Sequence, residues 1–226
     1  MASPPCRRCN SVYDVSARIG ALALSAVIAA LAALPVGAAD AANARAASGC
    51  AGHLLERVTG GMLTEQIVAH DQGPETELIH LCSSFGDRRF TFPEGPEGYG
   101  YSFIFAGLEF AGGETAALAW SWGFQAPPEL WVVSLVTHKV LFRKALPSDA
   151  KDPETILLGK LVLQRDGAVA WTQLSASGAC EVVEHTSRGT HVLNPTRQAQ
   201  PESLTLTGTT LRWLEEGGQA RTATLR

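Results

Sequence analysis

The chain contains little charge and no excess of basic residues. Charged residues make up 18% of the 226 residues and the formal net charge is −4, whereas about 25% charged residues is usual for soluble domains. Nucleic-acid binding depends on a basic surface, so this composition predicts no nucleic-acid partner. Hydrophobic residues make up 46%, too many for a disordered chain. The length suffices for one domain or a small array of repeats.

The sequence also lacks the motifs of common catalytic and metal centres. No Gly-x-Ser-x-Gly nucleophile elbow is present. The six histidines show neither His-x-His nor His-Glu-x-x-His spacing, and no Asp-rich calcium loop occurs. We therefore predict no metal, no cofactor and no catalytic residue. A serine triad with scattered members would leave no motif, so a non-catalytic protein is favoured over an enzyme without enzymes being excluded.

Residues 1–39 are typical of a secretory signal peptide. Three arginines are followed by an apolar run from Ile19 to Val36 and then by small residues. We predict cleavage after Ala39 and a secreted or extracytoplasmic mature chain. The mature chain is more acidic than the full sequence, because the three arginines are lost with the leader. The alternative is an uncleaved leader that anchors the chain in a membrane, since the run just reaches spanning length.

Cysteine usage agrees with an oxidising compartment. Cys6 and Cys9 form a Cys-x-x-Cys pair that leaves with the leader, and Cys50, Cys82 and Cys180 remain. Two of these three can pair. All three pairings stay open, with a weak preference for Cys50–Cys82, because its shorter loop is easier to close.

Two strand patterns recur along the mature chain. The first ends at His70, Trp120, Trp171 and Trp213. The second begins at Glu77, Glu129 and Glu181 and leads into a turn and a returning strand. Valine, isoleucine, leucine, threonine and tryptophan dominate both patterns and alternate with period two, which indicates β-strands.

These patterns predict an all-β protein with about four antiparallel sheet repeats. The units lie near 62–92, 100–146, 156–194 and 201–226, and residues 40–61 are a linker or N-terminal segment. Asp166-Gly167 between two apolar strands is a strong hairpin signal, and Leu54 to Val58 is the only mature stretch with helical spacing. Units of this size indicate a small or incomplete β-propeller; a two-sheet β-sandwich is the alternative.

One segment carries a resemblance to known repeat proteins. Leu161-Val-Leu-Gln-Arg-Asp-Gly-Ala-Val-Ala-Trp171 resembles the hairpins of Trp-Asp-repeat-like and TolB-like propellers. The tail from Ser203 to Trp213, with Thr222 to Leu225, is similar to the last unit of secreted proteins of unknown function from high-GC Gram-positive bacteria. The resemblance implies the architecture but no activity. The Gly-His…Trp-Asp pair of the full pattern is missing, which leaves ring closure open.

Four residues are weak ligand-binding candidates. Glu77, Glu129 and Glu181 recur, and equivalent positions of a propeller surround its axis; the simpler interpretation places each at the solvent edge of a strand. Trp122 adjoins the loop from Gly123 to Pro128, whereas the tryptophans as a group are expected in the core. His185 and His191 flank a turn, where a solvated cross-strand pair is the simplest interpretation.

The leading hypothesis is a secreted, non-catalytic β-repeat protein that acts as a binding or scaffold module. Its partner would be an extracellular protein or a glycan, bound by loops such as Phe92–Gly100 and Gly123–Pro128. One alternative is a secreted hydrolase or lyase acting on glycans or peptides, which requires convergent carboxylates. The other is one part of a larger propeller assembly, which predicts an exposed, unpaired strand edge.

Overall fold

The computed structural model describes residues 50, 52–68, 76–92, 103–122, 127–148, 156–174 and 179–226. These residues form four antiparallel sheets in which strands pair in chain order, so the all-β prediction is confirmed. The two-sheet sandwich alternative is wrong, because the strands divide into four sheets. The predicted signal peptide lies outside the described residues.

The first three sheets have four strands each and the fourth has three. The first sheet comprises β1 (His53–Val58), β2 (Gly61–Val68), β3 (Thr76–Ser83) and β4 (Arg89–Thr91). The second comprises β5 (Phe103–Ala111), β6 (Thr115–Trp122), β7 (Glu129–Ser134) and β8 (Lys139–Ala145). The third comprises β9 (Leu158–Leu163), β10 (Val169–Leu174), β11 (Cys180–Thr186) and β12 (Gly189–Val192). The fourth comprises β13 (Thr205–Thr207), β14 (Thr210–Leu214) and β15 (Ala220–Thr224), preceded by the short 3-10 helix Pro201–Ser203.

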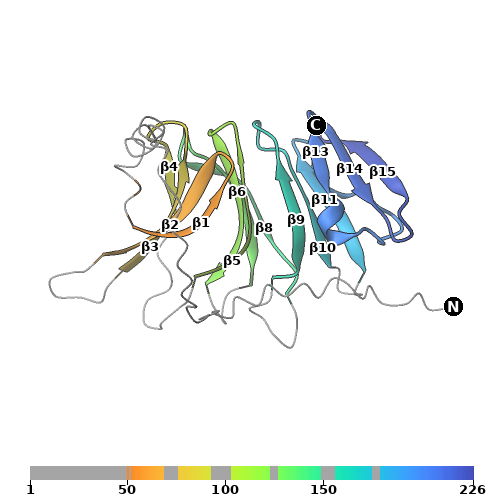
Figure 1. The fold of residues 1–226 in the computed structure, drawn as a ribbon, viewed down its shortest axis with the longest axis horizontal. Coiled ribbons are helices and arrows are strands. Elements are labelled where there is room, and N and C mark those ends of the chain that lie inside the picture. Colours follow the sequence, from red (N-terminus) through yellow and green to blue (C-terminus); the bar gives the residue numbers. More distant parts are fainter. Residues whose placement is uncertain are drawn as a thin grey trace, which may run out of the picture.

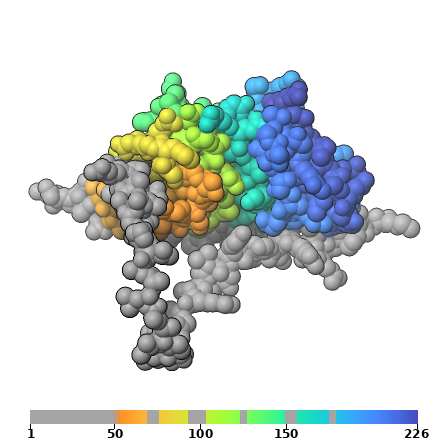
Figure 2. All heavy atoms as spheres, turned by 45° about the horizontal axis from the view of Figure 1, so that its top comes forward, coloured from red at the N-terminus to blue at the C-terminus, as the bar shows by residue number. Residues whose placement is uncertain are grey.

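The sheets stand in a row in chain order, with the first sheet at one end and the fourth at the other (Figure 1). The colours of the space-filling view follow the same order along the molecule (Figure 2). Within the described residues, hydrophobic clusters join the first sheet to the second, the second to the third, and the third to the fourth. No such cluster joins the fourth sheet to the first, so the described part is an open array.

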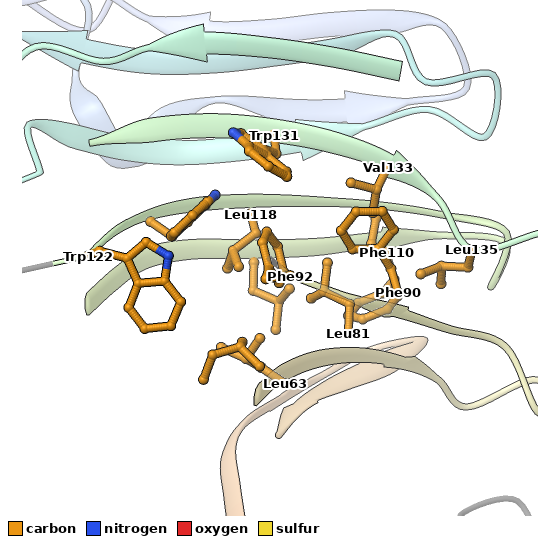
Figure 3. Packing of buried hydrophobic residues seen from close by; sticks show 14 residues of the cluster. Leu63, Leu81, Phe90, Phe92, Phe110, Leu118, Trp122, Trp131, Val133 and Leu135 are labelled. Carbon is orange, nitrogen blue, oxygen red and sulfur yellow. The ribbon is translucent and has the colours of Figure 1, made fainter. Parts of the chain in front are cut away.

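An aromatic-rich cluster fills the space between the first and second sheets (Figure 3). Phe92 lies at its centre, with ring centroids 5.0 Å from Trp120 and 5.5 Å from Trp131. Leu63 and Leu81 face these rings from the first sheet. Edge-to-face aromatic pairs such as Phe92–Trp120 contribute beyond their buried area, so this cluster holds the two sheets together.

Strand β6 shows how one strand serves two cores. All eight of its residues are buried. Leu118 and Trp120 face the first sheet, while Ala117 and Ala119 lie in the cluster shared with the third sheet. Because successive side chains of a strand point to opposite faces, a strand buried on both faces is continuously apolar rather than alternating.

Each of the first strands in the first three sheets carries a β-bulge. The register of β1, β5 and β9 against the following strand shifts by one extra residue. In β5 the shift is followed by Gly107, where an added Cβ would lie 2.8 Å from the Leu158 side chain of β9. Bulges bend and twist a strand, so their recurrence supports a true structural repeat, and the glycine permits β5 and β9 to pack closely.

The first repeat begins earlier than predicted. Leu54 to Val58, the stretch with helical spacing, lies in strand β1 and pairs with β2. The tight turn at Gly60, with φ 95°, reverses the chain and lets the strand pair locally, which overrides the short helical pattern. By contrast, Asp166-Gly167 forms the predicted hairpin turn, where Asp166 Oδ1 accepts the Ala168 amide at 3.0 Å.

The outer faces of the two end sheets differ. The outward face of the fourth sheet presents exposed threonines and Arg212, which lies opposite Thr205 and Thr222. The outward face of the first sheet carries Thr64 and His80, which are paired across β2 and β3 and are both buried. Terminal units of repeat arrays typically have polar outer faces, and the fourth sheet has this character.

Cys50 and Cys82 form a disulfide with a Cα–Cα distance of 6.2 Å. The predicted pairing is therefore confirmed. The bond attaches residue 50 to strand β3 on the outward face of the first sheet, next to Thr64. Cys180, the third cysteine, is buried at the start of β11.

Candidate functional site

The recurrent glutamates lie on three separate sheets, near the starts of β3, β7 and β11. Glu129 accepts a hydrogen bond from Trp131 Nε1 at 2.7 Å and one from Arg143 Nε at 3.0 Å. The Arg143 guanidinium also lies over the Trp131 ring, 5.5 Å from its centroid. Glu129 is therefore tied into its own sheet.

Glu181 has equally local partners. It is buried, and its carboxylate pairs with Arg197 Nε at 3.2 Å and accepts a hydrogen bond from Gln173 Nε2 at 3.3 Å. Burial, followed by the neighbouring Glu65 carboxylate, raises the pKa of Glu77 above its ordinary value. No hydrogen bond or ion pair joins any two of the three glutamates in the part of the chain that the structure describes.

The tryptophans occupy the core as predicted, and Trp122 is buried with them. Its ring centroid lies 5.4 Å from that of Phe103 and 5.8 Å from that of Trp120. A ligand-binding role for Trp122 stays a prediction. His70, most of the Phe92–Gly100 loop and most of the Gly123–Pro128 loop lie outside the described residues.

The two turn histidines do not face one another. In the β11–β12 hairpin His185 pairs with Thr190, whereas His191 pairs with Glu184. Adjacent residues of a strand point to opposite faces, so the interpretation as a cross-strand histidine pair is wrong. His185 stacks on Phe142 of the second sheet at 3.7 Å between ring centroids, and His191 belongs to the opposite face.

A pocket of about 350 Å³ lies between the third and fourth sheets. It is at the C-terminal end of β11, whereas Glu181 lies near the start of that strand. We call it the Glu184 pocket. Its lining combines one carboxylate, three basic side chains and two hydroxyls from β11, β12, the turn between them and the end of β15. These residues are Glu184, Thr186, Arg188, His191, Thr224 and Arg226.

Glu184 is the unusual residue of this pocket. Its Oε2 atom is buried and has no hydrogen-bond partner in the structure, which is costly for a polar atom. Burial raises the pKa of the Glu184 carboxyl above its ordinary value, against the opposing effects of His191 and then Arg188. Trp120 Nε1 and Trp213 Nε1 in the core also lack partners, so Glu184 is distinguished by its charge and by its place in a polar pocket.

The basic side chains of the pocket also lack ion-pair partners. Within the described residues, ion pairs engage five arginines elsewhere but neither Arg188 nor Arg226 nor His191. Thr186 Oγ1 accepts the Arg188 backbone amide at 3.2 Å, which fixes the turn but leaves the guanidinium free to bind. The basic side chains of the pocket therefore form no close ion pair within the described residues, although His191 and Arg188 act on Glu184 at longer range.

Comparison with the second sheet shows that the residue type at the position of Glu184 differs between repeats. By the register of the recurrent glutamates, Glu184 corresponds to Val132, and their cross-strand neighbours are His191 and Phe142. Val132 and Phe142 belong to the hydrophobic cluster between the second and third sheets. An apolar core position has thus become a charged pocket one repeat later.

Sequence reasoning missed this pocket, although one signal was available. Glu184 lies three residues after Glu181, as Val132 lies three residues after Glu129. A comparison of equivalent positions would have identified a carboxylate in place of an apolar residue. The participation of Arg226, from a different sheet, has no counterpart in any local pattern.

A second polar cluster surrounds His80 on the outward face of the first sheet. Its Nε2 donates to Gln66 Oε1 at 3.3 Å, which leaves Nδ1 to accept from the Thr91 hydroxyl at 2.9 Å. Burial, and secondarily the positive charge of Arg89, lower the pKa of His80 below its ordinary value. All of its hydrogen-bonding capacity is used, so we assign this cluster to stability.

The lowered pKa makes His80 a source of acid sensitivity. Below about pH 6.5 the unfolded chain protonates this histidine while the folded chain keeps it neutral, so the free energy of unfolding falls as the pH falls. We expect His80→Gln to reduce this fall between about pH 7.5 and 5.5, measured by urea unfolding. His53→Gln, at an exposed site, is the control; an unchanged pH slope in His80→Gln would contradict the assignment.

Two classes of site are absent from the described ranges. No group of three or more histidine, cysteine, aspartate or glutamate side chains there is placed to hold a metal ion. No helix within those ranges has the length and apolar character needed to cross a membrane.

The resemblance to propeller repeat proteins finds no support outside the chain itself and stays a prediction. Comparison of the chain with protein-family models, with curated proteins and with solved structures finds no match.

Proposed function

We propose that this chain is a secreted binding module: an open, propeller-like array that holds a ligand in the Glu184 pocket. The observation that carries the proposal is a carboxylate among basic side chains, none of them in a close ion pair within the described residues, at a position that forms apolar core in the preceding repeat. Such a substitution reduces stability, and residues that oppose stability are characteristic of functional sites.

Several features support the propeller-like arrangement. The sheets follow one another in chain order, the first strands β5 and β9 pack closely, and the bulges recur on the first strands. The leader pattern of residues 1–39 supports export. The array provides a rigid frame that places side chains of two sheets around one pocket.

The alternative functions have less support. A carboxylate-based hydrolase needs two acidic groups at one site, and Glu184 is the single acidic residue among those that line the pocket. A larger assembly would require an end sheet able to receive further blades. The outward threonines and Arg212 of the fourth sheet give that face a polar character, which opposes the packing of a further blade on this end.

The binding proposal is tested by two-dimensional amide NMR of the purified chain in the presence of a panel of sugars, organic acids, amino acids and short peptides. We expect at least one compound to shift the amide signals of Glu184, Arg188 and His191 in a saturable manner. Signals of Arg212 and its strand β14 serve as the internal control. A panel that moves no pocket signal would overturn the proposal.

Removal of the pocket carboxylate should stabilise the fold. We expect Glu184→Val, which restores the residue type of Val132, to raise the free energy of unfolding by about 1 kcal/mol at pH 7, because a buried carboxylate oxygen without a donor is eliminated. Chemical denaturation measures the change, and Glu216→Val, in the exposed β14–β15 turn, is the matched control. A loss of stability in Glu184→Val would show that the carboxylate supports the fold.

A further inference from the structure

We propose that the Glu184 pocket binds a monoanionic hydroxy acid, a ligand in which a carboxylate stands close to a hydroxyl group. This inference rests on the proposed binding function and adds the chemical class of the ligand. It follows from three properties of the pocket: its arginines without ion pairs, its single carboxylate and its net charge.

The unpaired cations specify the anionic part of the ligand. Arg188 comes from the β11–β12 turn and Arg226 from the residues after β15. Guanidinium groups bind carboxylates through paired, charge-assisted hydrogen bonds. Because no ion pair within the described residues has to be broken, a carboxylate that enters the pocket gains these contacts and bridges the third and fourth sheets.

The carboxylate of Glu184 specifies the second part of the ligand. An ionised carboxylate can only accept hydrogen bonds. Its Oε2 is covered by protein atoms and has no donor, so a ligand hydroxyl beside the bound carboxylate would donate to the other oxygen of Glu184. The hydroxyls of Thr186 and Thr224 on the same wall add partners for further polar groups.

The net charge of the lining favours a monoanionic hydroxy acid over dianions and over zwitterions. The lining contains two arginines and one glutamate, and this excess of one positive charge is matched by one negative charge on the ligand. A dianion such as phosphate would place a second negative charge against Glu184. A zwitterionic amino acid has no net charge and would leave the positive excess of the lining uncompensated.

The volume of the pocket admits two sources of this chemistry. About 350 Å³ lies near the lower end of the 300–1,000 Å³ that is usual for ligand pockets. Both a small free hydroxy acid and the acidic unit of a sugar fit within that space. The experiment therefore includes one probe of each kind.

The test is calorimetric titration of the purified chain with D-glucuronate, L-lactate, D-glucose, acetate and inorganic phosphate. We expect one or both hydroxy acids to bind about tenfold more tightly than glucose, which lacks the carboxylate, and acetate, which lacks the hydroxyl. Tight binding of glucuronate alone identifies a sugar acid, whereas comparable binding of lactate identifies a small hydroxy acid.

Matched variants locate the binding. Arg188→Gln and Arg226→Gln should each weaken hydroxy-acid binding by about tenfold, while Arg212→Gln, on the outward face of the fourth sheet, should not. Equal losses in all three variants, or hydroxy acids no better than acetate and glucose, would overturn the ligand class. If another compound then shifts the pocket signals in the NMR panel, the binding function stands; if none does, both proposals are wrong.

Discussion

Trp171→Ala is expected to lower the free energy of unfolding by about 3–5 kcal/mol, the range for truncation of a large buried aromatic residue. The Trp171 side chain has no solvent exposure and belongs to the cluster between the second and third sheets. Its Nε1 also donates to Gln173 Oε1 at 2.7 Å. The variant therefore creates a cavity and removes the donor of a hydrogen bond at the middle of the array.

The measurement is urea unfolding followed by far-ultraviolet circular dichroism, because the substitution removes one of the five tryptophans and so alters the fluorescence signal itself. Leu141→Ala is the control, since this residue is 49% exposed on the edge strand β8 and its truncation should change stability by about 0.5 kcal/mol or less. A loss below about 1 kcal/mol for Trp171→Ala would show that the sheets do not depend on this cluster for their stability.

The position of Trp171 between the second and third sheets also affects the cooperativity of unfolding. In arrays where each unit contacts only its neighbours, stability is a sum of unit and interface contributions. Disruption of the interface between the second and third sheets should separate unfolding of the first two sheets from that of the last two. We expect a broader transition in Trp171→Ala than in the unmodified chain.

Strand patterns were the predictable part of this fold, because burial in a sheet is recorded locally in the sequence. The alternation of Leu211 and Trp213 and the turn at Asp166-Gly167 each depend on residues close in the chain. Strand β1 was missed because its helical spacing is short and its strand state comes from pairing with β2. Local patterns therefore yielded the strands but not the first boundary.

The candidate site was less predictable, because it depends on contacts between sheets. Recurrence drew attention to Glu129 and Glu181, but each proved to be bound by partners in or beside its own sheet. Glu184 is informative for the opposite reason, since it breaks the repeat at a core position. Its approach to Arg226 is set by how the fourth sheet stacks on the third, which no local pattern records.

Loss of the Cys50–Cys82 disulfide is expected to lower the free energy of unfolding by about 3–4 kcal/mol, the entropic estimate for a closed loop of this length. The bonded cysteines are separated by 32 positions in the sequence, a loop that contains β1, β2 and most of β3. Without the bond, the unfolded chain gains freedom that the folded first sheet does not, so the effect arises mainly in the unfolded state.

The double variant Cys50→Ala with Cys82→Ala tests this expectation by urea unfolding and amide hydrogen exchange. Each single variant is its own control, because loss of either sulfur removes the same bond and should cost as much as the double change. Exchange should quicken most in β1 and β2, which the bond encloses, and least in the fourth sheet. If the double variant unfolds at the same urea concentration as the unmodified chain, the aromatic cluster against the second sheet is sufficient to hold the first sheet, and the disulfide has no stabilising role.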